Sequence, residues 1–417
     1  MGRRTILNAT LAALVMLLCV SACAPQPDFR ANISKITRPY VFNAVAWEAE
    51  QAAIAVHRWW SGYEMDGADT QAVQAYFTNV DAIKELQAAS PPNGVDVARD
   101  AVAQLLAENM DLADRVESVL EHQLSEVLRE QGIYGVFPSQ ENTGQPLFPP
   151  VDFKLAEPPH LLVISPRQHI GTIREVILAQ ELSVDDVEAI EEKADGLGVS
   201  SLVVPLGGLA ATYPAFVTGD ADLDFVLATM AEEWVHQYLV FRPLGFQYVL
   251  DLTGISPNYE IATINETVAS MAGDELARIL EDTFYPNLAE SSTDTSAAGG
   301  FNYYGEMRNI RRNVDTMLAA GHVMEAETYM AEKRDYLESE GYYIRKLNQA
   351  YFAFYGAYAD SPGSISPIGA ELAVLREESG SLAEFLQVVS EITSRADLAR
   401  LVGGSYEQPS DSMHGEQ

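Results

Sequence analysis

The 417-residue sequence predicts a mostly helical α+β protein, because two different periodicities follow one another along the chain. Between residues 95 and 130, apolar side chains recur at helical spacing, for example at Val102 and Leu105, which predicts a long helix with one apolar face. Short runs rich in β-branched residues then appear at 161–165 and 201–205, and they predict strands. Because helical segments return afterwards, we expect a small mixed sheet among helices.

Predicted helices and strands continue to alternate between and after these runs. A helix is predicted at 184–195, between the two predicted strands. A third candidate strand at 210–217 contains Pro214, and because proline cannot donate to a central ladder, we expect an edge strand. A long apolar-periodic helix follows at 225–240 and ends before Pro243.

Three aspartates, Asp220, Asp222 and Asp224, precede that helix. A calcium loop is excluded because its sixth position would be Phe225 instead of glycine and its twelfth Ala231 instead of glutamate. We therefore expect the aspartates to be the N-cap and first-turn anions of the helix.

Proline-rich and low-complexity stretches divide the chain into segments. The predicted segments are a signal (1–22), a linker after Cys23 (23–39), a helical N-terminal region (40–155), a metal-site core (156–287), a flexible linker (288–300), a C-terminal helical region (301–403) and a polar tail (404–417). The C-terminal region is predicted to hold two long helices within 303–358 and another at 381–394.

The first two dozen residues have the layout of an export signal. Arg3 and Arg4 precede an apolar run at 11–20, and a Ser-Ala pair then leads directly to Cys23. This resembles a bacterial lipoprotein signal. The resemblance implies a lipidated Cys23 and a membrane-anchored lipoprotein of the bacterial cell envelope, facing the extracytoplasmic side. The apolar run is shorter than the roughly 20 residues of a spanning helix, which favours lipidation over an uncleaved anchor.

Composition excludes several classes of partner and site. The chain has Lys+Arg 26 against Asp+Glu 60, so it lacks the basic excess that releases counterions from a phosphate backbone, and we expect no nucleic-acid partner. Cys19 lies inside the predicted signal, so the mature chain would keep only Cys23 and could form neither a disulfide framework nor a cysteine metal site. Any metal must be bound by His, Asp or Glu.

Glu232 and His236 are four residues apart in the helix predicted at 225–240. Residues at this spacing lie on one helix face, so both side chains can reach the same metal ion. Glu233 would lie beside that ion, where it could take a proton from water and later pass it to a leaving amine.

A third ligand must come from elsewhere in the chain, and Glu266 is the best candidate. It lies in a second helix predicted at 259–280. Ser270, four residues later, could support this ligand through a hydrogen bond. We expect a divalent metal held by these side chains.

Two other interpretations were weighed for the acidic helix. An ordinary solvated face is disfavoured because Trp234, Val235 and Leu239 make the helix apolar over much of its surface. The Glu-x-x-His motif of di-iron bundles needs a second copy, and Glu157 with His160 is interrupted by two prolines that cannot lie inside a helix.

Two stretches resemble the active-site helix and the glutamate helix of gluzincin-type zinc metallopeptidases. They read Ala-Glu-Glu-Trp-Val-His-Gln-Tyr-Leu at 231–239 and Asn-Glu-Thr-Val-Ala-Ser at 265–270. Arg-Lys-Leu-Asn-Gln-Ala-Tyr at 345–351 is similar to a block of the bacterial aminopeptidase-like members. The likeness spans about 161–394 and implies a zincin-like core.

The resemblance also implies roles. It assigns metal ligands at 232, 236 and 266, a general base at Glu233, and zinc as the metal. It implies that Tyr351 could stabilise an oxyanion, and that the strand at 210–217 pairs with an extended peptide substrate.

The sequence departs from the family at Glu232, where the family has histidine. Two glutamates and one histidine neutralise a dication, whereas one glutamate leaves about one positive charge. The ion becomes a weaker Lewis acid, and oxygen-rich ligation moves the preference from zinc towards manganese or iron(II).

The leading functional prediction is a membrane-anchored metal-dependent peptidase that acts on peptides or proteins. The alternatives are a catalytically inactive relative that binds peptides or envelope proteins, and a purely structural lipoprotein.

Overall fold

The computed structural model describes residues 27–44, 46–48, 69–89, 95–134, 147–286, 301–359 and 361–403. The predictions for the signal, Cys23, the linker at 288–300 and the tail lie outside these residues. Among the described helices, none combines the length and the apolar composition that a membrane span requires.

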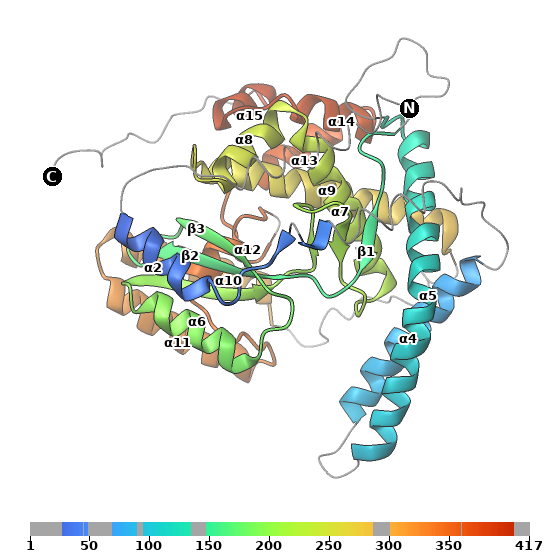
Figure 1. Cartoon of the computed structure of the whole chain (residues 1–417). Helices are drawn as coiled ribbons and strands as arrows, with labels where there is room; N and C mark the ends of the chain where they lie inside the picture. The colour runs from blue at the N-terminus through green and yellow to red at the C-terminus, as the bar shows by residue number, and fades with distance from the viewer. Residues whose placement is uncertain are drawn as a thin grey trace.

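Helices form most of the described chain, and short strands form two small sheets (Figure 1). The helices are α2 (Pro27–Thr37), α4 (Asp69–Ala89), α5 (Val95–Glu130), α6 (Val184–Asp195), α7 (Leu223–Val240), α8 (Pro243–Leu252), α9 (Tyr259–Phe284), α10 (Tyr303–Ala319), α11 (Val323–Ser339), α12 (Gln349–Tyr355), α13 (Ile368–Glu378), α14 (Leu382–Val389) and α15 (Arg395–Leu401). The strands are β1 (Phe153–Leu155), β2 (His160–Pro166), β3 (Arg174–Leu178), β4 (Val199–Pro205), β5 (Gly208–Leu209) and β6 (Ala215–Val217). The predicted mostly helical α+β class is confirmed.

Helices α7 and α9 pack side by side at the centre of the molecule (Figure 1). Leu227 and Val235 of α7 and Ile264 and Val268 of α9 are fully buried in one hydrophobic cluster. Each such side chain contributes roughly 1.5–3 kcal/mol by leaving water. At Gly273 the backbone of α9 comes so close to α7 that an added Cβ would lie 3.0 Å from a Glu232 atom. The small residue therefore sets the separation of the two helices.

The start of α7 agrees with the prediction for the aspartates. Asp222 occupies the N-cap position with extended backbone, and Asp224 lies in the first turn, where the helix dipole favours an anion. The Asp222 carboxylate forms its ion pair with Lys84 of α4 instead of capping the helix backbone.

One sheet has the order β3-β2-β4 and is antiparallel. The predicted strands at 161–165 and 201–205 correspond to β2 and β4, and the predicted helix at 184–195 is α6. Ile190 of α6 packs with Ile164 on one face of the sheet, and Ala350 of α12 packs on the other. Strand β3 was not predicted, because its sequence begins with a charged pair.

The other sheet has the order β1-β6-β5 and overturns the predicted edge strand at 210–217. Strand β6 lies in the centre, parallel to β1 and antiparallel to β5. Pro214 immediately precedes β6, so it does not have to donate to the ladder. The edges of this sheet are β1 and β5, neither of which was predicted as a strand.

The N-terminal helices join the same core. Figure 1 shows α4 and α5 as a long pair at one side of the molecule. Tyr76 of α4 donates a hydrogen bond to the Gly219 carbonyl oxygen (3.0 Å), and Leu120 and Leu124 of α5 belong to the cluster that includes α7 and α9. These contacts attach the helical pair to the centre.

Several helices stand where the sequence predicted something else. A linker was expected at 23–39, but α2 forms there because Ile33 is fully buried. Helix α7 ends at Val240, before Pro243, as the sequence predicts. Pro243 then occupies the first turn of α8, a helix that was not predicted, where a missing N–H costs nothing. Instead of one helix at 381–394, α14 and α15 each begin after a serine cap, and α13 was not predicted.

We expect Gly273→Ala to destabilise the protein by about 1–3 kcal/mol through overpacking. The gain in helix propensity, about 1 kcal/mol, is outweighed because the neighbours of the new Cβ include the Glu232 backbone nitrogen and the Ala228 carbonyl oxygen. Urea unfolding measures the change. The control is Gly171→Ala, whose Cβ would meet His169 at an ordinary 3.6 Å and should be neutral or slightly stabilising. Increased stability of Gly273→Ala would contradict the close contact.

Candidate metal centre

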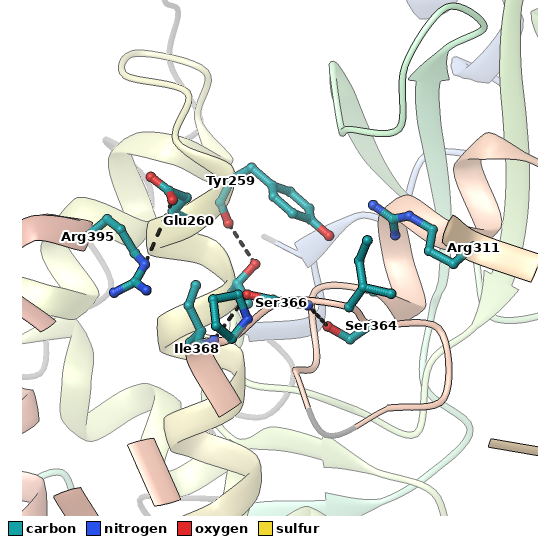
Figure 2. A pocket seen from close by; sticks show the side chains of 11 residues that line it. Tyr259, Glu260, Arg311, Ser364, Ser366, Ile368 and Arg395 are labelled. Carbon is teal, nitrogen blue, oxygen red and sulfur yellow. Dashed lines mark hydrogen bonds and ion pairs between the residues drawn. The ribbon is translucent and has the colours of Figure 1, made fainter. Parts of the chain in front are cut away.

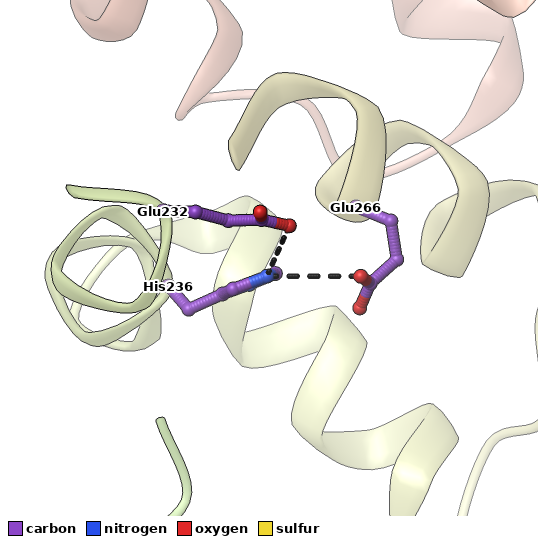
Figure 3. A group of neighbouring side chains, drawn as sticks. All are labelled: Glu232, His236 and Glu266. Carbon is purple, nitrogen blue, oxygen red and sulfur yellow. Dashed lines mark ion pairs between the residues drawn. The ribbon is translucent and has the colours of Figure 1, made fainter. Parts of the chain in front are cut away.

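Three potential ligands converge between α7 and α9. Figure 3 shows Glu232 and His236 from α7 pointing towards Glu266 from α9. The His236 Nε2 atom lies 3.9 Å from Glu232 Oε1 and 3.7 Å from Glu266 Oε2, and one ligand atom of each residue lies within 4.8 Å of the others. These separations are too long for hydrogen bonds. Ligand atoms around a tetrahedral ion lie about 3.4 Å apart, so a small contraction would let this group hold a divalent ion.

Asn265 orients the histidine. Its side-chain oxygen lies 2.9 Å from His236 Nδ1, and Asn265 is 1% exposed. With Nδ1–H donating to this oxygen, neutral His236 turns the lone pair of Nε2 towards the two carboxylates. This is the tautomer that a metal ion needs, and the partner of the other ring nitrogen fixes it.

Two tyrosines hold Glu266. The Tyr248 hydroxyl of α8 donates to Glu266 Oε1, which leaves Oε2 facing His236. The Tyr358 hydroxyl, just after α12, also hydrogen-bonds to Glu266. Burial is the main cause, and the Glu266 charge the next, that raises the pKa of both phenols well above the ordinary value of a tyrosine. Both tyrosines therefore stay neutral and keep donating to the carboxylate.

Glu233 lies between the ligand cluster and the edge strand β5. It is 9% exposed, and it forms a hydrogen bond with the backbone of Ala210. A Cβ added to Gly208 would lie 2.2 Å from Glu233 Oε1, so the glycine makes room for the carboxylate. Burial first, and then the charges of Glu232 and Glu266, raise the pKa of Glu233 well above its ordinary range.

The site contains an excess of negative charge. Glu175 of β3 also faces it, and burial together with the charges of Glu266 and Asp251 raises its pKa to about 7. Within the described part of the chain, no lysine or arginine forms an ion pair with Glu266, and its basic neighbour is His236, whose Nε2 lies 3.7 Å from Glu266 Oε2. Carboxylates gathered in this way repel one another, and a cation placed among them relieves that repulsion.

The other two residues predicted for the site, Ser270 and Tyr351, are not among the three potential ligands. Ser270 is half-buried on α9, one turn after Glu266. Tyr351 packs against Tyr355 with ring centroids 4.5 Å apart and hydrogen-bonds to Tyr303, and burial raises its pKa. Among the described contacts of Tyr351, none reaches the ligand cluster.

Arg345 and Asn348, from the block that resembles the aminopeptidase-like members, have structural contacts. Arg345 pairs with Glu191 of α6 at 2.5 Å, and the Asn348 side chain caps α12. The residues that do touch the site, Tyr248 and Tyr358, carried no local sequence signal, because folding alone brings them to Glu266. Asn265 could have been found, since it directly precedes a predicted ligand.

A cavity of about 320 Å³ lies beside the first turns of α9 (Figure 2). Tyr259 and Thr263 line it, and both lie on the face of α9 that continues to Glu266. Arg311 and Arg395, each 8% exposed, also line it, and they are paired with carboxylates of α10 and α13. The cavity therefore combines apolar walls with arginines whose charge is already neutralised.

The chain was also compared with known proteins. No protein-family model, no curated protein and no solved structure matches it. The resemblance to gluzincins therefore stays a prediction from the motif residues.

Replacing the orienting amide should weaken metal binding. We expect Asn265→Ala to lower zinc or manganese affinity about 10–100-fold, because His236 Nδ1–H would lose its acceptor. Asn265→Asp keeps an acceptor oxygen and should largely restore the affinity. Competition with a chelating dye measures it.

The matched control is Asn313→Ala, which removes a helix asparagine whose hydrogen bond goes to Tyr329 on α11. Its metal affinity should equal that of the parent chain. Unchanged affinity in Asn265→Ala would show that this amide does not orient a ligand.

Proposed function

We propose that the chain is a divalent-metal-dependent peptidase with a zincin-like core, anchored to the bacterial cell envelope through a lipidated Cys23. The observation that carries this proposal is the convergence of Glu232, His236 and Glu266, contributed by two packed helices, with Glu233 buried alongside. A metal site assembled in this way, next to an additional carboxylate, has the parts that hydrolysis of an amide requires.

Each side chain then has a definite task. A bound ion would supply Lewis acidity to polarise a peptide carbonyl. Glu233 accepts a proton from the attacking water and delivers it to the departing amine. Tyr248 and Tyr358 keep one oxygen of Glu266 turned towards His236, and the surrounding apolar residues of α7 exclude bulk water.

Strand β5 is an edge strand with which an extended peptide substrate can pair. It ends the order β1-β6-β5 and runs directly beside Glu233. An extended substrate that added itself to this edge through backbone hydrogen bonds would bring a peptide bond next to the carboxylate. Gly208 keeps this approach open because it has no side chain.

The ligand set favours a hard ion. Two carboxylates and one neutral imidazole leave a dication site with no net charge, and oxygen-rich ligation suits manganese or iron(II) better than a site with two imidazoles does. We therefore propose manganese or iron(II) alongside zinc as the metal.

The same feature supports a second candidate function. With Glu232 in place of a histidine, the ion is a weaker Lewis acid, and the protein could hold a metal and a peptide without cleaving the peptide. In that case it is a peptide-binding or envelope-protein-binding lipoprotein.

Glu233→Gln separates the two functions. The amide cannot accept the proton, so cleavage of a panel of peptides with free and blocked N-termini should fall about 10²–10⁴-fold, while metal affinity stays near that of the parent. Glu192→Gln, at an exposed position of α6, is the control. Hydrolysis that survives in Glu233→Gln would exclude this base, and a parent chain inactive on the whole panel would favour the binding protein.

Glu232→His tests whether the other ligands are correctly placed. A second imidazole should raise zinc affinity about tenfold or more, because zinc binds imidazole nitrogen strongly. Isothermal titration calorimetry measures the change, with the exposed substitution Glu192→His as the control. If zinc affinity does not rise, His236 and Glu266 are not ligands of a common ion.

A further inference from the structure

Helix α2 places positive charge on a strongly acidic molecule. The formal net charge of the chain is −34, yet residues 27–47, which begin with α2, contain Arg30, Lys35 and Arg38 against a single acidic residue, Asp28. Lys35 and Arg38 are exposed. This local excess favours an orientation in which α2, and not the acidic remainder, meets an anionic surface.

The body of the protein fixes the direction of these charges. Ile33 is fully buried in a cluster with Leu162 and Ile190, and Phe29 and Ile36 pack against that cluster. The apolar side of α2 is therefore committed to the sheet and α6. Lys35 stays on the side of α2 that faces solvent, and Arg30 is half-buried.

An uncharged loop with exposed aliphatic side chains lies beside α2. Arg30 Nη2 is 3.5 Å from the place that a Cβ on Gly254 would occupy, so Arg30 reaches the connection between α8 and α9. Leu252, the last residue of α8, and Ile255 in the connection are 50% and 58% exposed, and residues 252–258 include no charged side chain. Exposed aliphatic residues next to cations are typical of surfaces that enter the headgroup region of a bilayer.

We propose that Arg30, Lys35, Arg38, Leu252 and Ile255 form a surface that contacts an anionic phospholipid bilayer. We name it the α2–loop surface, and its assignment depends on the proposed lipidation of Cys23. Pro27, the first residue of α2, follows Cys23 by four residues, a length of chain that spans at most about 14 Å. An acylated Cys23 therefore keeps α2 close to the headgroups.

Contact through this surface places the metal centre near the membrane. Tyr248, which donates to Glu266, lies four residues before Leu252 on α8, a rise of about 6 Å. The cluster is thus one short helix away from the loop that would enter the bilayer. The proposed substrates are accordingly peptide segments lying at the membrane surface.

A fluorescent label on the loop tests the contact. The lipidated mature chain would have no free thiol, so Ile255→Cys introduces a single site for a polarity-sensitive dye. The protein is reconstituted in vesicles of equal parts phosphatidylglycerol and phosphatidylcholine that contain a lipid with a quencher on its acyl chain. We expect a blue-shifted, strongly quenched label at 255. The matched control is Met110→Cys, 79% exposed on α5, which lies on the other side of the molecule from α2 (Figure 1) and should stay water-like.

A pair of charge variants tests the electrostatic part. Lys35→Gln with Arg38→Gln should reduce quenching at 255 on the anionic vesicles, and should change it little on phosphatidylcholine alone. Arg99→Gln with Arg129→Gln removes two exposed cations of α5 and should have no effect. An unquenched label at 255 overturns the α2–loop surface, and so does equal quenching in both charge pairs.

The premise and the proposed function are measured separately on the same preparation. Mass spectrometry must find the acyl groups on Cys23, and their absence overturns the inference. Metal titration reports on Glu232, His236 and Glu266 whatever the label shows. Retained metal binding with an unquenched label therefore rejects the membrane surface alone.

Discussion

The close packing of α7 against α9 is the contact on which the rest of the molecule depends. Gly273 lets the two backbones approach at Glu232, and the buried apolar residues on either side keep them there. This approach brings a ligand of α9 within reach of two ligands of α7. Helices α5, α8, α13 and α14 and strands β5 and β6 pack on the pair, so the same contact that closes this core also assembles the candidate metal centre.

Buried charges in proteins are usually paired with an opposite charge, and the candidate metal centre departs from this rule. The charge of Glu266 acts on Glu175, and the charges of Glu232 and Glu266 act on Glu233. Within the described part of the chain, the basic side chain beside Glu266 is the imidazole of His236. Buried carboxylates without a compensating cation are costly. The hydroxyls of Tyr248 and Tyr358, which hydrogen-bond to Glu266, offset part of this free-energy cost. A bound cation would offset the rest. A site that is unfavourable when empty has a correspondingly strong attraction for a divalent cation.

The sequence was sufficient where local spacing determines structure. Glu232 and His236 were predicted because helical periodicity and a four-residue spacing need no knowledge of the fold, and Glu266 was predicted as the best candidate on a second helix. Most helices followed from the same periodicity, and two strands followed from short runs of β-branched residues. Tyr248 and Tyr358 were missed because tertiary folding alone brings them to Glu266. The position of Pro214 was misjudged because the proline lies just outside a strand. Helix α2 was missed because its burial of Ile33 depends on a sheet formed more than a hundred residues later.

The ligands of the candidate centre lie on two separate helices, and this has a mechanical consequence. An ion bound to His236 and Glu266 would join α7 to α9 as a removable cross-link, in a protein whose cysteines give it no covalent one. At an ion concentration a hundred times the dissociation constant, such a link adds about 2.7 kcal/mol to the free energy of unfolding. The resistance of the folded chain to heat and to proteolysis would then follow the concentration of the metal ion around the protein.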